Sequence, residues 1–115
     1  YAIAGVANDV MGEGPIPSTK VALQKAGLTL DKIEVIESNE AFAAQSLTVA
    51  KGLGFDPART NVNGGAIALG HPYGMSGIRY LGSTLLELGR RNAKRALIGV
   101  CTAGGMGVVA ILERP

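Results

Sequence analysis

The hydrophobic pattern of the chain changes period several times between its two ends. Short apolar runs that contain β-branched residues and are bounded by charged or turn-forming residues predict buried strands. The run with Ile33, Val35 and Ile36 is the clearest of these, because charged residues flank it. Strands are predicted over residues 1–6, 32–38, 60–62, 96–101 and 108–112.

Three segments carry apolar residues at helical spacing. The first opens at Pro17 and Ser18 and ends at Gly27, a residue type that suits the left-handed position after a last turn. The second, residues 40–52, has so few polar positions that burial on most sides is expected. The third covers residues 78–90 and is amphipathic, with an apolar stripe that contains Ile78, Leu81, Leu85 and Leu88.

The segment 63–77 interrupts this periodic pattern. It holds five glycines and one proline, so the sequence predicts an irregular, shaped loop there. The element order is then βαβαβαββ, in one domain of residues 1–115 without an internal repeat or linker. Alternating strands and helices favour a mainly parallel α/β sheet with right-handed crossovers, and the short last connection permits an antiparallel closing strand.

Composition and charge narrow the classes of protein to which the chain can belong. Its 115 residues, 47% of them apolar, suffice for one globular domain with one core. A net charge of +2, with Arg90 and Arg91 as the only adjacent arginines, is too small to indicate a nucleic-acid partner. No apolar run approaches the roughly 20 residues of a membrane span. The abrupt start at Tyr1, in a strand-like segment, leads us to expect a piece of a longer protein.

A single cysteine, Cys101, limits the sulfur chemistry that the chain can support. It excludes an internal disulfide framework and any metal site built from several cysteines of this chain. A reducing compartment, the cytoplasm, is therefore the expected location. No motif indicates a bound metal or cofactor.

Three polar positions interrupt otherwise apolar or glycine-rich segments: Asn39 with Glu40, His71, and Cys101. Asn39 and Cys101 follow predicted strands, and ligand sites gather at the carboxyl ends of parallel strands. His71 lies on a loop whose glycines allow it to fold over the same edge. Taken singly, each has a simpler interpretation: a helix cap, a solvated imidazole and a small buried thiol. The residues alone thus predict an α/β domain with a suspected cysteine–histidine site.

The residues around these positions resemble the signature blocks of the thiolases. The blocks are Asn-Glu-Ala-Phe-Ala at residues 39–43, Asn-Gly-Gly-Ala-Ile-Ala-Leu-Gly-His-Pro-Tyr-Gly-Met-Ser-Gly at residues 63–77, and Cys-Thr-Ala-Gly-Gly-Met-Gly at residues 101–107. A fourth resemblance is Met-Gly-Glu-Gly-Pro at residues 11–15. The order and separation of the blocks also match, so the resemblance covers the whole chain. It corresponds to the last part of a family member, somewhat under a third.

The resemblance implies a fold and an activity. Thiolases have a duplicated βαβαβαββ fold, in which two similar halves pack in five layers around one active site. The implied fold class is an α/β half with a mixed, mostly parallel five-stranded sheet and helices on both faces. Thiolases join two acetyl-CoA molecules into acetoacetyl-CoA, or cleave longer 3-ketoacyl-CoA with coenzyme A, through an acyl-thioester on a cysteine. That nucleophile belongs to the amino-terminal half, so this chain alone is expected to be inactive.

Partners follow from the same resemblance. They are acyl-CoA or coenzyme A, the amino-terminal half, and further copies in a homodimer or homotetramer. Coenzyme A thioesters are substrates here, so no cofactor is implied. A role in fatty acid metabolism is implied, whereas acyl chain length and metabolic direction do not follow from this part of the sequence.

The resemblance also implies a role in the thiolase reaction for one residue of each of the three blocks. The α-proton of a thioester is weakly acidic, so its removal needs a base at the carbon and donors at the oxygen where enolate charge develops. Cys101 is implied as that base, and as the acid towards the departing enolate in cleavage. His71 is implied as a donor to the enolate or thioester oxygen and as a support for the missing nucleophile. Asn39 is implied to hold a water that completes this oxyanion hole.

A second oxyanion hole is implied at the backbone of Ala103 and Gly104. Ala103 stands where many relatives have glycine, and its N–H group remains usable if φ stays negative, where alanine is allowed. We therefore expect the alanine to preserve function. The resemblance also implies apolar walls for the pantetheine arm of coenzyme A, formed by Met11, Ala41, Phe42, Ala66 and Leu69.

Two other functions are alternatives to a thiolase half. A decarboxylating ketosynthase of the same superfamily uses two histidines, whereas this chain has only His71. A non-catalytic module with the same fold would bind a partner through an exposed face, but it has no need of Asn39, His71 and Cys101 together. The thiolase half is therefore the favoured hypothesis.

Overall fold

A single mixed sheet with helices on both faces forms the core of the chain. The computed structural model describes residues 1–115. The strands are β1 (Ala2–Gly5), β2 (Val35–Ser38), β3 (Arg95–Thr102) and β4 (Met106–Glu113), in the order β1-β4-β3-β2. The helices are α1 (Pro15–Ala26), α2 (Ala43–Leu53), α3 (Ala66–Leu69) and α4 (Tyr73–Arg91). Three 3-10 turns join them: η1 (Asn8–Glu13), η2 (Leu30–Lys32) and η3 (Pro57–Arg59).

The sheet differs from the prediction of five mostly parallel strands. It has four strands, of which only β2 and β3 run parallel, while β4 is antiparallel to both β3 and β1. The strand predicted at residues 60–62 is reduced to a single bridge between Thr60 and Ile36. Asn61 ends that bridge, because its φ of 48° lies in the left-handed region and turns the chain away. The connection between β3 and β4 is too short for a parallel crossover, which makes this pair antiparallel.

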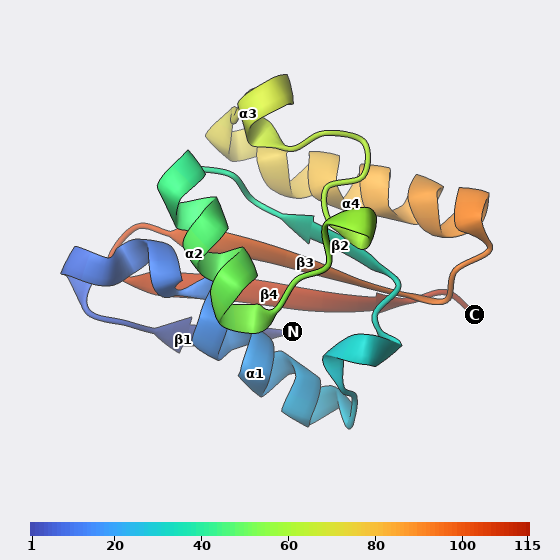
Figure 1. Ribbon diagram of the computed structural model, residues 1–115, viewed down its shortest axis with the longest axis horizontal. Coiled ribbons are helices and arrows are strands. Elements are labelled where there is room, and N and C mark those ends of the chain that lie inside the picture. Colours follow the sequence, from blue (N-terminus) through green and yellow to red (C-terminus); the bar gives the residue numbers. More distant parts are fainter.

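Alternate residues of the strands face two separate apolar layers. Ile36 and Leu97 belong to the layer beneath α1 and α2. Val35 and Ala96, one position earlier on the same strands, pack with Leu88 of α4 on the opposite face. Figure 1 shows α1 and α2 together on one side of the sheet, with α4 apart from them. Helices on both faces were predicted, and this is confirmed. Each fully buried Ile or Leu side chain contributes about 1.5–3 kcal/mol to this packing.

Helix α4 turns its most apolar stripe away from the sheet. The α4 stripe, which consists of Ile78, Leu81, Leu85 and Leu86, is largely exposed: Ile78 by 71%, Leu85 by 58% and Leu86 by 64%. The helix also begins at Tyr73, so the predicted loop over 63–77 in fact contains α3 and the first turn of α4. None of the helices, α4 included, combines the length and apolarity needed to cross a membrane. The face of α4 that is buried carries Ser76, Tyr80, Thr84, Glu87 and Leu88.

Helix α2 is also less buried than its composition predicts. It buries only Gln45 and Val49, whereas Leu47 is exposed. Its amino-terminal flank, Phe42, is exposed as well, although Phe42 lies beside the cavity described below. The nearly all-apolar composition of residues 40–52 therefore does not mean burial within this chain.

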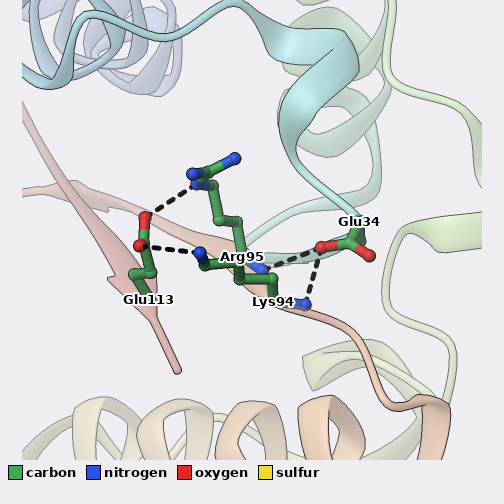
Figure 2. Close-up of polar contacts among 4 residues, drawn as sticks. All are labelled: Glu34, Lys94, Arg95 and Glu113. Atoms are coloured by element: carbon green, nitrogen blue, oxygen red, sulfur yellow. Dashed lines mark hydrogen bonds and ion pairs between the residues drawn. The ribbon is translucent and has the colours of Figure 1, made fainter. Parts of the chain in front are cut away.

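A polar cluster at the start of β3 ties three strands together (Figure 2). The Glu34 carboxylate accepts hydrogen bonds from the backbone N–H groups of Lys94 and Arg95, at 2.7 and 2.9 Å. Arg95 Nε donates to Glu113, its register partner on β4, at 2.8 Å. The backbone N–H of Arg95, followed by that of Lys94, lowers the pKa of Glu34, and the Arg95 side chain lowers the pKa of Glu113. The cluster fixes the end of the sheet that lies away from the β3–β4 turn.

Candidate active site

The three polar positions singled out in the sequence lie at one edge of the sheet. Ser38 pairs with Gly99 in the parallel β2–β3 ladder, so Asn39 and Cys101 emerge from neighbouring strands at the same edge. The backbone N–H of Asn39 continues the ladder by donating to the Gly99 carbonyl at 2.8 Å. His71 reaches this edge from the segment between α3 and α4. In Figure 1 it is the left end of the sheet, where η1, the start of α2 and the β3–β4 turn gather.

An open cavity of about 550 Å³ lies over this edge. His71 and Cys101 both line it, which brings together the two residues expected to handle protons. Tyr73 stands edge-on to the His71 ring, with 5.1 Å between the ring centroids. The sequence did not single out Tyr73. The lining is mostly apolar and consists of Met11, Ala41, Phe42, His71, Tyr73, Val100, Cys101, Thr102 and Ala103.

Hydrogen bonds hold both ring nitrogens of His71. Nδ1 lies 2.7 Å from Ser76 Oγ, and Ser76 Oγ donates to the Pro72 carbonyl at 3.1 Å. Nε2 lies 3.4 Å from Nδ2 of Asn39, a buried residue, and Oδ1 of Asn39 accepts a hydrogen bond from the Tyr80 hydroxyl. Ser76 and Tyr80 were missed in the sequence. They are four residues apart on α4 and so share its buried face.

Cys101 is buried and in its resting form is a thiol. Burial raises the pKa of the Cys101 thiol above its usual range. The backbone N–H of Cys101 and the side chain of Asn39 act in the opposite direction, because both favour the thiolate. The site therefore disfavours a free thiolate, while Asn39 provides a polar group that supports it once a proton leaves.

The β3–β4 turn places a backbone segment against the cavity. Gly104 and Gly105 have φ angles of 81° and 75°, which glycine adopts without strain. A Cβ atom at Gly105 would overlap the Val6 carbonyl, so the turn is packed as well as bent. Ala103 lines the cavity and is not among the residues with positive φ, so its methyl group is accommodated without backbone strain.

Comparisons with known proteins now place the chain in a family. The description "Thiolase, C-terminal domain" matches residues 1–114. The chain belongs to the thiolase family. It is 53% identical over 115 residues to the acetyl-CoA acetyltransferase of Paracoccus denitrificans, and 56% identical over 114 residues to that of Pseudomonas aeruginosa. These matches cover 100% and 99% of this chain and 29% of each relative.

A solved structure agrees with this assignment. The crystal structure of human mitochondrial 3-ketoacyl-CoA thiolase in complex with CoA matches with a TM-score of 0.97 and 46% identity. The match covers 99% of this chain and 29% of that chain. The thiolase domain thus corresponds to less than a third of the proteins it resembles, as the sequence blocks predicted.

Only part of the predicted apolar wall of this thiolase domain lies at the cavity. Met11, Ala41 and Phe42 line it, from η1 and from the segment before α2. Ala66 is instead buried within α3, and Leu69 is 59% exposed outside the lining. The reason is that residues 66–69 wind into the short helix α3, which turns them away from the cavity.

The thiolase domain also buries charge directly behind the site, which the sequence analysis missed. Glu37 on β2 is only 3% exposed, and burial raises its pKa to about 7. The Arg79 guanidinium lies over the Tyr80 ring, 4.8 Å from its centroid, and attraction to Arg79 partly offsets the rise at Glu37. Side chains two residues apart on a strand share a face, so Glu37 lies on the same side of β2 as Val35, the side that packs against α4. This period was the sequence signal from which the burial of Glu37 could have been predicted.

Asn39 and Glu40 follow β2 beside the cavity of the thiolase domain, and the sequence left their structural roles open. Asn39 is not a helix cap, because α2 begins at Ala43 and no side chain caps it. Glu40 accepts hydrogen bonds from Asn61 Nδ2 and from the Ile67 backbone N–H, both at 2.9 Å. Glu40 thus ties the segment before His71 to the end of β2.

Proposed function

We propose that this thiolase domain supplies the base and an oxyanion-binding group to an acyltransferase site for coenzyme A thioesters. The observation that carries the proposal is the convergence of His71 and Cys101 on one apolar cavity, with Asn39 held against His71. The relatives named acetyl-CoA acetyltransferase and the thiolase solved with CoA support the substrate class. The reaction is condensation of acetyl-CoA to acetoacetyl-CoA, or thiolytic cleavage of that or a longer 3-ketoacyl-CoA.

Cys101 fits the proton-transfer step of this reaction. In condensation its thiolate takes the α-proton of acetyl-CoA, and the resulting enolate attacks an acyl group held elsewhere. In cleavage its thiol returns the proton to the departing enolate. A thiol whose pKa is raised by burial gives a thiolate of greater proton affinity, which matches a weak carbon acid better than an ordinary thiolate does.

His71 and Asn39 fit the stabilisation of enolate charge. Both present nitrogen atoms next to the cavity edge, and N–H groups aimed at a developing oxyanion are worth far more in an apolar site than in water. The backbone N–H groups of Ala103 and Gly104 are proposed as a second set of donors, for the tetrahedral intermediate. These roles require no bound metal or cofactor.

The amino-terminal half of a thiolase is the proposed partner of the α4 stripe. The stripe exposes a contiguous set of large apolar residues on a helix whose other face is already packed. Exposed apolar patches of this kind mark interaction surfaces. The chain spans 29% of its relatives, so a partner half with the acyl-bearing cysteine would supply the remainder. We further propose a homodimer or homotetramer, a cytoplasmic location and a role in fatty acid metabolism for the whole enzyme.

The test is thiolysis of acetoacetyl-CoA, followed by the loss of its absorbance. The chain is assayed alone and after mixing with the amino-terminal portion of the Paracoccus denitrificans acetyl-CoA acetyltransferase. Activity is expected only in the mixture, and Cys101→Ser is expected to abolish it. A mixture that forms a stable complex but has no activity, or a Cys101→Ser mixture as active as the parent, would refute the proposal.

A further inference from the structure

Glu40 uses both oxygens of its carboxylate to join two segments that are distant along the chain. Oε1 accepts a hydrogen bond from Asn61 Nδ2, and Oε2 accepts one from the backbone N–H of Ile67, both at 2.9 Å. Ile67 belongs to the first turn of α3, where N–H groups have no partner within the helix. Gly65, which precedes α3, has no side chain with which to cap these groups. Glu40 therefore does from a distance what a capping side chain does locally.

Asn61 fixes the other oxygen of this carboxylate to the sheet. Its backbone N–H donates to the Ile36 carbonyl at 2.8 Å. Its carboxamide accepts from the backbone N–H of Ser38 at 2.8 Å and donates to the Ser38 carbonyl at 2.9 Å. Asn61 thus pairs with β2 through its side chain at the point where its backbone turns away. The Glu40 carboxylate is held from the rigid side of the site.

Gly65 is buried and packs directly against the Glu40 carboxylate. A Cβ atom at this position would overlap the carboxyl group, since the three atoms nearest to it are Cδ, Oε2 and Oε1 of Glu40. The φ of Gly65 is −99°, which alanine adopts without strain. The close approach of the carboxylate, and not the backbone conformation, is therefore what requires glycine here.

The path from Glu40 to His71 is a single helical turn. The Gly70 N–H donates to the Ala66 carbonyl at 2.8 Å, which closes the turn, and His71 follows immediately. Of the four residues of α3 only Ala66 is buried. A helix this short does not form without support from outside it, because nucleation is unfavourable. The turn, and the backbone that leaves it, depend on the contact with Glu40.

We infer that Glu40 is a positioning residue for His71: its carboxylate, fixed by Asn61, holds the turn of α3 so that the chain leaves it with His71 at the cavity. The contacts of the imidazole with Ser76 and Asn39 set the orientation of the ring. Glu40 sets the place of the backbone that carries the ring. Catalytic groups displaced by as little as about 1 Å lose much of their effect, so this contact bears on the reaction.

The first test observes His71 directly. It is the single histidine of the chain, so its imidazole signals in an NMR spectrum report one group. The Tyr73 ring stands edge-on to it at 5.1 Å between centroids and shifts these signals while the two rings stay together. Glu40→Ala is expected to move them towards their positions in the urea-unfolded chain at the same pH. Glu34→Ala removes a carboxylate that accepts two backbone hydrogen bonds at the far end of the sheet, and this matched control is expected to leave them in place.

Gly65→Ala separates the position of the carboxylate from its charge. The added methyl group displaces the carboxylate of Glu40 but does not remove it, so the His71 signals are expected to move in the same direction as in Glu40→Ala. In the Glu40→Ala background the same change is expected to have no further effect, because the atoms that the methyl group would overlap are gone.

Three outcomes would overturn the inference. The first is a Glu40→Ala spectrum with unchanged His71 signals. The second is a shift in Glu40→Ala with none in Gly65→Ala, which would show an effect of charge. The third is an equal shift from Gly65→Ala with and without Glu40. Circular dichroism verifies that each variant is folded, and Glu40→Gln, which keeps the size of the side chain but has a single acceptor oxygen, replaces Glu40→Ala if that variant does not fold.

A second readout addresses the catalytic consequence, which rests on the proposed function. The same variants are joined covalently to the amino-terminal portion of the Paracoccus denitrificans enzyme and assayed for thiolysis. Glu40→Ala and Gly65→Ala are each expected to lower kcat about tenfold with KM changed less than about twofold, the double variant no further than Glu40→Ala alone, and Glu34→Ala not at all. An active parent with an unchanged kcat in both variants counts against the inference. An inactive parent counts against the proposed function alone, and the His71 signals then decide the inference.

Discussion

Glu37 makes the stability of this domain depend on pH in a direction that can be worked out from the structure. Its carboxyl is 3% exposed, and burial raises its pKa from 4.5 to about 7. Between these two values the folded chain binds more protons than the unfolded chain, so stability is greatest at low pH and falls as pH rises towards 7. Replacing Glu37 with glutamine keeps the neutral shape of the side chain and removes this dependence.

The magnitude follows from the size of the shift. A difference between 4.5 and about 7 corresponds to about 3.4 kcal/mol as an upper limit. Rearrangement of the site and solvent screening reduce this to about 1–2 kcal/mol. Relative to the parent, Glu37→Gln is therefore expected to gain about 1–2 kcal/mol of unfolding free energy between pH 5 and pH 8.

Urea denaturation followed by circular dichroism measures this difference. The quantity to compare is the urea midpoint of Glu37→Gln minus that of the parent. With an m value on the order of 1–1.5 kcal/mol/M, this difference is expected to grow by about 1 M from pH 5 to pH 8. Glu13→Gln removes the same charge from an exposed position and is expected to give a curve parallel to that of the parent. If Glu37→Gln also runs parallel to the parent from pH 5 to pH 8, the reasoning about buried charge is wrong.

Four further outcomes can be checked on the same chain. Glu34→Gln is expected to be less stable than the parent at neutral pH. The pKa of Glu34 is lower in the folded chain than its unfolded value of 4.5, so the ionised carboxylate stabilises the fold at pH values above 4.5, and the difference should vanish in thermal melts near about pH 2. Iodoacetamide is expected to alkylate Cys101 about tenfold faster at neutral pH after unfolding in guanidinium, since burial raises its pKa; equal rates would contradict a buried thiol. Gly105→Ala is expected to lose about 1–3 kcal/mol in a denaturation curve, because of its positive φ and the overlap with backbone. Leu85→Glu on the α4 stripe is expected to prevent reconstitution of thiolysis while the chain melts normally, whereas Leu47→Glu on α2, also exposed but on the other face, serves as the control.

The part of the site that the sequence predicted is the part fixed by local pattern. Val35 and Ile36 mark β2 clearly, and Cys101 closes a strand that runs parallel to it, so the shared edge follows from strand order. His71 was also singled out from the residues, because its glycine-rich loop can fold over the same edge, and it lines the cavity. The thiolase resemblance added the role expected of it. The helices on both faces follow from the nearly continuous apolar runs of β2 and β3, because successive side chains of a strand point to opposite faces of the sheet and both faces then need a cover.

What the sequence did not predict depends on partners distant along the chain. The apolar periodicity of α4 identified a helix but not the direction in which its stripe faces, because no residue of this chain covers it. Tyr80 carries no local signal, since its hydrogen bond to Asn39 forms only when β2 brings Asn39 beneath α4. Thr60 had β propensity but lost its strand to the left-handed turn at Asn61. Leu69 lies outside the cavity lining of this chain, in the short helix α3, which forms in a segment that glycine content predicted as a loop.

The two faces of helix α4 make different contacts, so a rotation of the helix about its axis affects both. One face holds Ser76 and Tyr80 against the site, while the opposite face presents the apolar stripe. A helix rotates about its axis as a rod, so any roll imposed by the seating of a partner on Leu85 or Leu86 displaces Tyr80 in the opposite sense. If the proposed amino-terminal half seats on the stripe, its fit therefore also sets the position of the side chains that α4 holds against the cavity.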